Sequence, residues 1–230
     1  MDAQVELKKL DEVIINCRKC PRLVLWREKV AKEKRRAYLN WEYWGKPVTG
    51  FGDIAGRIIV VGLAPGAHGA NRTGRVFTGD RSSDFLASAL YRAGLANQPQ
   101  SVNRNDGLIL RDVYITLACK CVPPKNRPKI DEIKKCMPYL IKELRLMNNL
   151  KVIVTLGKIA FDTMKNILEY QKTSIDKLTF HHGAEYQTQD NLVLIASYHP
   201  SQRNTQTGRL TQEMFDMIWG RALEIINKEN

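Results

Sequence analysis

The stretch from residue 62 to residue 85 combines glycine with side chains that can do chemistry. It holds five glycines and a set of polar and aromatic residues, namely His68, Asn71, Arg72, Arg75, Phe77 and Asp80. Glycine lets the backbone approach a ligand closely, and backbone N–H groups attract negative charge. A connection of about 20 residues is long for a plain turn, and long loops tend to carry function. We therefore interpret this stretch as a ligand site, with a plain surface loop as the alternative.

Five cysteines form a second candidate site. Cys17 and Cys20 have the spacing of paired metal ligands, and Cys121 and Cys136 complete a set of four if the N-terminal segment folds against the Cys121 loop. Four thiolates suit an iron–sulfur cluster or a structural zinc ion, and the spacing does not separate the two. Cys119 ends an apolar strand, so we expect it to be buried and unligated. The alternative is that all five are unligated.

Apolar runs alternate with helical patterns and predict the scaffold. Strands are expected at residues 57–61, 113–118, 152–156 and 192–196. Helices are expected at residues 2–17 and, after the four strands, from Ser82-Ser83 (as N-cap), Lys129, Lys158 and Thr211. This alternation implies right-handed βαβ units, and therefore a three-layer α/β/α fold with a central four-stranded parallel sheet. We expect one domain over residues 1–230, with loops at 45–56 and 171–191 and a kink or break at Pro138.

Three polar segments follow the predicted strands. They are the Gly-rich stretch, the loop at Cys121 and the segment that begins His199-Pro200-Ser201. Ligands of parallel α/β sheets bind at the carboxyl ends of the strands. We therefore expect the three segments to converge on one edge of the sheet.

The charge of the chain indicates a polyanionic partner. Lys and Arg number 36 against 24 Asp and Glu, a net charge of +12 over 230 residues. Between Trp26 and Trp44, basic residues alternate with aromatic ones, a composition that suits nucleic acid, although a solvated helix face is the alternative. No run approaches the roughly 18 apolar residues that span a membrane, and the N-terminus has no apolar signal core. We expect a cytoplasmic protein that binds nucleic acid and no membrane.

Taken together, these motifs resemble the uracil-DNA glycosylase superfamily, and its iron–sulfur type-B branch (family 5) most closely. The resemblance rests on residues 62–69 (GLAPGAHG), 71–75 (NRTGR), 77–80 (FTGD), 199–201 (HPS) and 207–210 (TGRL), on Asn204 and on the four cysteines in the family's order. These motifs extend over nearly the whole chain, and their order and spacing are highly specific.

The resemblance implies a fold like the one expected above and hydrolysis of the N-glycosidic bond of deaminated bases in DNA, which leaves an abasic site. It also implies a [4Fe–4S] cluster apart from the chemistry, with structural zinc as the alternative. The N-terminal segment 1–56 would contribute two of its cysteine ligands. The partner is DNA that contains deaminated bases, and we expect a monomer.

The resemblance also assigns roles to residues. His199 would donate a hydrogen bond to the departing base, and Asp80, or Asn71 as its rival, would handle the cationic sugar or the water. Substrate contacts are expected from Gly62, Leu63, Ala64, Pro65, Gly66, Phe77 and Leu117. DNA contacts are expected from Ser201, Gln202, Arg203, Asn204, Arg209 and Lys125.

Two positions depart from related branches. Leu63 and Ala64 stand where other branches carry an acidic or amide side chain, and Leu117 stands where they carry an Asn that reads uracil. A pocket without that reader is expected to discriminate less, and to accept hypoxanthine and xanthine besides uracil. The rival functions are a non-catalytic, metal-stapled nucleic-acid-binding module, an electron carrier, and a phosphate-handling hydrolase. The last is disfavoured because no Gly-Lys-Ser/Thr follows the Gly-rich stretch.

Overall fold

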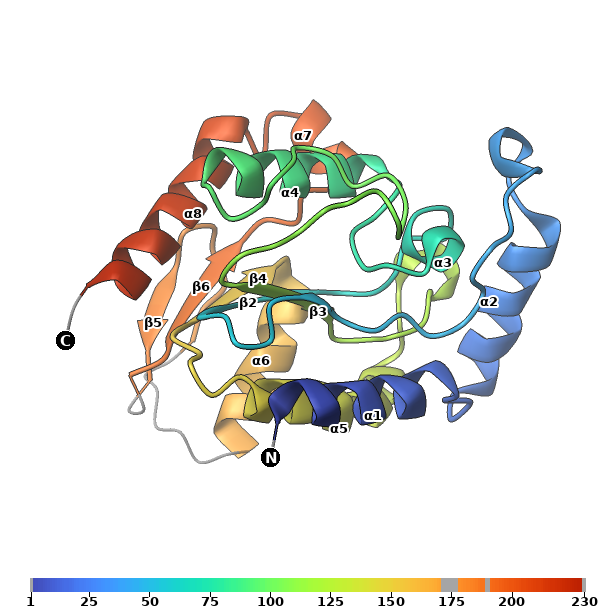
Figure 1. Ribbon diagram of the computed structural model, residues 1–230, viewed down its shortest axis with the longest axis horizontal. Coiled ribbons are helices and arrows are strands. Elements are labelled where there is room, and N and C mark those ends of the chain that lie inside the picture. The colour runs from blue at the N-terminus through green and yellow to red at the C-terminus, as the bar shows by residue number, and fades with distance from the viewer. Residues whose placement is uncertain (1, 171–177, 189–190, 229–230) are drawn as a thin grey trace.

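A six-stranded sheet forms the centre of the computed structural model, which describes residues 2–170, 178–188 and 191–228 (Figure 1). The strands are β1 (Phe51–Gly52), β2 (Ile58–Gly62), β3 (Val113–Leu117), β4 (Val152–Leu156), β5 (Glu185–Gln187) and β6 (Val193–Ser197). Their order is β1-β3-β2-β4-β6-β5. The inner four pair in parallel, whereas β1 and β5 pair antiparallel at the two edges.

The predicted four-stranded parallel sheet is therefore the centre of a larger, mixed sheet. Each predicted strand lies within one residue of the observed one. The loops expected at 45–56 and 171–191 contain the edge strands β1 and β5, and these predictions were incomplete because strands of two or three residues show no alternation to detect. Residues 171–177 and 189–190 of the second loop lie outside the described residues.

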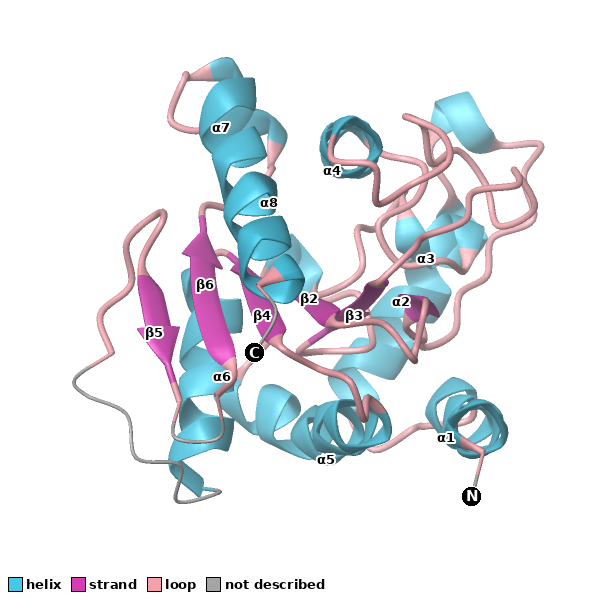
Figure 2. Ribbon diagram, turned by 60° about the vertical axis from the view of Figure 1, so that its left-hand side comes forward, coloured by secondary structure: helices cyan, strands magenta, loops and turns pink. Residues whose placement is uncertain are grey.

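Helices cover both faces of the sheet (Figures 1 and 2). The described helices are α1 (Ala3–Ile15), α2 (Pro21–Glu33), η1 (Arg36–Tyr38), α3 (Ala70–Thr73), α4 (Arg81–Arg92), η2 (Pro124–Asn126), α5 (Ile130–Leu146), α6 (Lys158–Tyr170), α7 (Gln202–Gln206) and α8 (Gln212–Asn227). Side chains alternate across β2, so Ile58 and Val60 face the core shared with α4 and α8. Ile59 and Val61 face the core shared with α1, α5 and α6. These two cores make the three layers.

Two details of the helices differ from the expectation. Helix α4 begins two or three residues earlier than predicted, because the Asp80 carboxylate rather than Ser82 or Ser83 is its N-cap and accepts a hydrogen bond from the Ser83 backbone N–H. Helix α5 runs through Pro138 as one element, so the break that was one of the two outcomes expected there is absent. A proline removes a single N–H···O bond from a helix, and burial of Tyr139 and Leu140 beside it keeps the helix whole.

None of the helices that the structure describes is long and apolar enough to cross a membrane.

The segment between residues 26 and 44 begins within α2, whose first residue is Pro21, a favoured residue at that position. It then turns through η1 and projects beyond the body of the molecule, on the right of Figure 1. Its outer part borders the cavity described next.

Candidate active site

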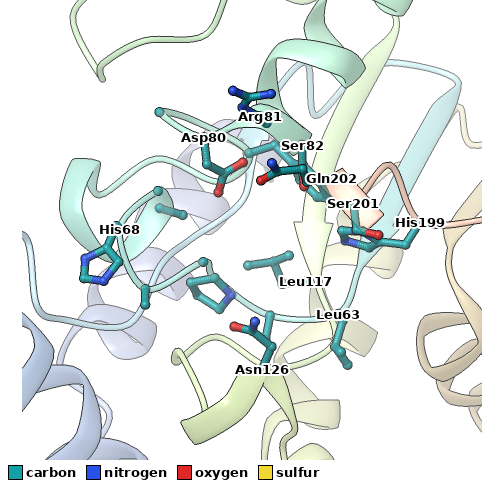
Figure 3. Close-up of a pocket in the computed structure, with 18 of the residues that line it drawn as sticks. Leu63, His68, Asp80, Arg81, Ser82, Leu117, Asn126, His199, Ser201 and Gln202 are labelled. Atoms are coloured by element: carbon teal, nitrogen blue, oxygen red, sulfur yellow. The ribbon is translucent and has the colours of Figure 1, made fainter. Parts of the chain in front are cut away.

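Three loops at the carboxyl ends of the strands surround a cavity of about 780 Å³ (Figure 3). They follow β2, β3 and β6, as the topology of the parallel strands requires. Of the residues predicted from the sequence, those that line the cavity are Leu63, Ala64, Pro65, Gly66, Phe77, Asp80, Leu117, His199, Ser201, Gln202 and Arg203. The expected convergence of distant segments on one edge is thus present.

The two carboxylate oxygens of Asp80 make different contacts. Oδ1 accepts hydrogen bonds from the backbone N–H and the hydroxyl of Ser83, at 3.0 and 2.9 Å, and so caps α4. Oδ2 lies against the backbone of Gly66 and Gly69, where a Cβ atom would collide with it. The carboxylate is half-buried and faces the cavity. A charged oxygen is therefore held in a fixed direction by the helix that it caps.

The close contact at Gly69 gives a testable prediction. Gly69→Ala is expected to displace the Asp80 carboxylate and to lower the rate of the reaction at this site by roughly 10²-fold, because small misplacements of a reacting group are costly. Gly220→Ala is the control, since a Cβ at Gly220 meets no atom within 4 Å. Single-turnover rates of both variants, with thermal melting to check folding, measure the effect. An unchanged rate in Gly69→Ala would show that the carboxylate needs no fixed position.

His199 reaches the cavity from the loop after β6. Burial lowers the pKa of its imidazole from 6.5 to about 4, and the nearby Asp80 carboxylate opposes part of that shift. Its backbone carbonyl accepts hydrogen bonds from the Asn204 side-chain amide and the Ser201 N–H, both at 2.8 Å. A Cβ on Gly157, whose φ is +96°, would meet the His199 Cβ at 3.2 Å. The imidazole is therefore neutral near pH 7, and the backbone that carries it is fixed by its own loop.

Phe77 forms the aromatic surface of the cavity. Its ring lies 6.0 Å from the His199 ring, centroid to centroid, at an interplanar angle of 32°. Its φ of +43° is unusual for a residue with a side chain and is typical of strained positions at functional sites. A Cβ on Gly62 would meet Phe77 at 2.6 Å and Leu117 at 2.9 Å. Gly62 does not line the cavity, but its lack of a side chain lets both neighbours do so.

The remaining predicted residues lie outside the lining. Asn71 is 1% exposed, and its amide donates to the Arg27 carbonyl at 3.3 Å. The Asn204 amide holds His199, and the Arg209 guanidinium stacks on the Tyr198 ring at 4.6 Å. Lys125 is exposed in η2, beside the cavity. Asn71 is therefore not positioned to replace Asp80.

The cavity is also lined by residues that were not among the site residues predicted from the sequence, namely Arg35, Tyr38, His68, Arg81, Ser82 and Asn126. Of these, Arg35 and Tyr38 belong to the basic and aromatic segment at 26–44, and Ser82 was expected only as a helix cap. Asn126 presents an amide from η2 on the side away from Asp80 (Figure 3). Its position in the loop after β3 could have indicated this, because polar residues in loops at the carboxyl ends of parallel strands face the ligand site. His68 is hydrogen-bonded through Nδ1 to the Tyr43 hydroxyl at 3.0 Å.

Four of the five cysteines gather behind one wall of the cavity, whereas Cys17 packs beside Ile14 and Tyr139. Cys20, Cys119, Cys121 and Cys136 are buried in one cluster, against which Ala64 packs. The Arg27 guanidinium, 2% exposed, donates to the Cys121 sulfur at 3.0 Å and to the Cys17 carbonyl at 3.2 Å. The N-terminal segment thus folds against the Cys121 loop. No three His, Cys, Asp or Glu side chains within the described ranges form a group that could hold one metal ion.

The sheet, the Gly-rich loop after β2 and the cavity agree with what the sequence motifs imply, the uracil DNA glycosylase superfamily. The sequence matches that superfamily over residues 49–222, and the chain belongs to it. A Type-5 uracil-DNA glycosylase of Thermus thermophilus is 48% identical over 89% of this chain and 91% of its own length. A Type-5 uracil-DNA glycosylase of Pyrobaculum aerophilum is 46% identical over 91% of this chain and 88% of its own.

A Type-4 uracil-DNA glycosylase of Pyrobaculum aerophilum is more distant, at 32% identity over 86% of this chain and 84% of its own length. The predicted membership of the superfamily, and the similarity to its type-5 branch, are thus confirmed.

Proposed function

We propose that this protein is a DNA glycosylase of base excision repair that hydrolyses the N-glycosidic bond of uracil in DNA and leaves an abasic site. The observation that carries the proposal is the cavity at the carboxyl ends of the strands, where Asp80 and His199 meet from separate loops. The 46–48% identity to Type-5 uracil-DNA glycosylases over most of the chain supports it. We also propose that the chain acts as a single domain and a monomer in the cytoplasm.

The target base must leave the duplex to reach this cavity. Turning a nucleotide out of the stack costs a few kcal/mol, which contacts in the pocket offset. The Phe77 ring offers a stacking surface for the base, and residues 63–66 line the same space. At about 780 Å³ the cavity has room for a base together with part of its sugar. Base and sugar thus lie between Phe77 and Asp80.

Bond cleavage leaves negative charge on the base and positive charge on the sugar. The neutral His199 imidazole donates a hydrogen bond to the base as its charge develops, which lowers the barrier to departure. The Asp80 carboxylate stabilises the cationic sugar and orients the attacking water through Oδ2, since Oδ1 is occupied by the α4 cap. The proton that the water loses passes to solvent or to the carboxylate. The two residues therefore act on opposite charges.

The short helix α7 supplies the groove contact. The Ser201 hydroxyl accepts a hydrogen bond from the Asn204 N–H at 3.3 Å and so caps α7, which leaves Gln202 and Arg203 exposed at the rim of the cavity. We assign Gln202 to the gap that the everted base leaves and Arg203 to a phosphate. Arg209 and Lys125 are further phosphate contacts in this proposal.

The range of bases that the enzyme accepts depends on which side chains of the cavity face the base. Leu117 gives the base an apolar contact, and Asn126 is a polar residue that the loop after β3 contributes to the lining. A pocket that lacks a rigid reader at residue 117 accepts hypoxanthine and xanthine besides uracil. Removal of uracil alone from matched oligonucleotides would contradict this broad range.

We propose that the cysteines hold a [4Fe–4S] cluster. Cys17, Cys20, Cys121 and Cys136 supply four thiolates, with Cys119 as a buried neighbour whose thiol donates to the Cys121 carbonyl. With structural zinc as the alternative, the burial of Cys20, Cys121 and Cys136 in one group suits such a cluster. When bound, it would staple the N-terminal segment to the Cys121 loop.

Substitution of one ligand tests the cluster. Cys136→Ser is expected to abolish the brown colour and the absorbance at about 400 nm of anaerobically purified protein, because three thiolates hold such a cluster poorly. Cys119→Ser is the matched control and is expected to keep both, since this thiol is not assigned as a ligand. Iron and zinc analysis of the wild type decides between the two metals. A zinc-loaded, colourless wild type would rule out the cluster.

The activity itself is tested on oligonucleotides that each contain one uracil, hypoxanthine or xanthine. Incubation followed by alkaline cleavage is expected to cut each strand at the modified position. The rival function, a non-catalytic nucleic-acid-binding module, predicts binding without any cleavage. Intact strands after prolonged incubation with enzyme in excess would therefore refute the glycosylase.

A further inference from the structure

We propose that residues 34–41, here called the arm, are a second DNA-contacting element that binds the strand bearing the everted base. The inference rests on the proposed function and adds a contact apart from α7. In Figures 1 and 2 the arm and α7 lie apart, with the Gly-rich loop between them. Arg35 and Tyr38 of the arm line the same cavity as Gln202 and Arg203 of α7. The cavity is thus bordered by two separate basic elements.

The arm is fixed to the Gly-rich loop through Arg72. Its guanidinium carbon lies 4.0 Å from the ring centroids of both Tyr38 and Trp41, a double cation–π contact. The same side chain, 4% exposed, donates from Nε to the His68 carbonyl at 2.7 Å and from Nη2 to the Gly79 carbonyl at 2.8 Å. Arg72 therefore joins the arm to both ends of the loop that leads to Asp80. A ligand that the arm binds is thus held at a fixed position relative to the cavity.

The charge of the arm suits a phosphate backbone. It contains Lys34, Arg35 and Arg36 and no acidic residue. Lys34 closes the turn by donating to the Leu39 carbonyl at 3.1 Å. Arg35 and Arg36 are exposed and form no ion pair with any residue that the structure describes. The Arg35 guanidinium at the cavity, with Arg36 next to it in the chain, is positioned to neutralise phosphates beside the flipped nucleotide.

The arm also presents an exposed apolar side chain. Leu39 is 56% exposed and directly follows Tyr38, which lines the cavity. Proteins that open a duplex insert apolar wedges at base steps to offset the cost of unstacking. We assign Leu39 to the bases that flank the target nucleotide, where it lowers the cost of everting that nucleotide from a stacked duplex. In this proposal Arg35 increases the affinity for DNA, and Leu39 assists the eversion of the target nucleotide.

The phosphate contact is tested with Arg35→Gln. Its affinity for a uracil-containing duplex, measured by fluorescence anisotropy, is expected to fall roughly 10-fold, and the slope of log K against log salt to fall by about 1. Arg145→Gln is the matched control, because Arg145 is exposed in the last turn of α5, away from the cavity lining. Equal affinity and salt slope in the two variants would overturn the arm as a phosphate contact.

The wedge is tested with Leu39→Ala. Single-turnover excision from duplex DNA is expected to slow roughly 10-fold, while excision from the same strand without its complement is unchanged, because a single strand needs no unstacking help. Leu25→Ala, a leucine 70% exposed on α2, is the control. Equal slowing on both substrates, or none on either, would overturn the wedge. Wild-type protein that releases no uracil from either substrate would refute the proposed function itself, which separates the two failures.

Discussion

Replacing His199 by alanine is expected to lower the single-turnover rate of uracil excision by roughly 10²–10³-fold, the usual loss when one donor to a developing anion is removed. The reason is that the imidazole is the ring nitrogen donor that the loop after β6 brings to the cavity. Binding of uracil-containing DNA is expected to change little, because the hydrogen bond strengthens only as the base leaves. Quenched-flow or manual single-turnover assays with enzyme in excess measure the rate directly.

The control for this variant is His181→Ala, since His181 is exposed and does not line the cavity. The pH profile gives an independent check. Because burial holds the pKa of His199 at about 4, its imidazole stays neutral as pH falls from 8 to about 5, and it gains a proton only below that range. The wild-type rate is therefore expected to show no acidic limb near pH 6.5. A limb at that pH that disappears in His199→Ala would contradict a buried, neutral donor.

Asp80→Asn is expected to lower the rate by roughly 10²–10⁴-fold, because the amide keeps the shape but loses the charge that faces the sugar. Asparagine is as good an N-cap as aspartate, so α4 should remain capped and the melting temperature should stay near that of the wild type. The comparison thus isolates the charge of Oδ2 from the structural role of Oδ1.

Asp80→Ala supplies the matched comparison. It removes the cap as well as the charge, and it is expected to cost about 1 kcal/mol of stability in addition to the same loss of rate. Thermal or urea unfolding measured beside the excision rate separates the two effects. Near-wild-type excision by Asp80→Asn would transfer the role to another polar group of the lining, such as Asn126.

The sequence predicts the inner scaffold well because each inner strand is buried on both faces. Such strands are continuous apolar runs, as in Val152–Leu156, and their boundaries fall within one residue of the prediction. The edge strands β1 and β5 are too short to show a pattern. Asn126 also escaped notice, because the proline-rich loop around it lacks periodicity and its φ of +55° depends on how the folded loop closes.

Asp80 shows why motif spacing located the site better than it assigned roles. From the sequence, this residue is either a turn residue before a helix or a carboxylate that faces the substrate. In the structure it caps α4 with one oxygen and faces the cavity with the other, so the two interpretations are compatible. Asn71 has the same polarity and lies in the same stretch, but its side chain points into the protein interior. Only the fold of the loop distinguishes the two.

Ala64 lines the cavity on one side and packs against the cysteines on the other. At this point a single side chain, the methyl group of Ala64, separates the cavity from the cysteines. A side chain larger than alanine at position 64 must therefore crowd either the everted nucleotide or the sulfur atoms. A change in the packing of the thiols would therefore reach the wall of the cavity directly, through Ala64.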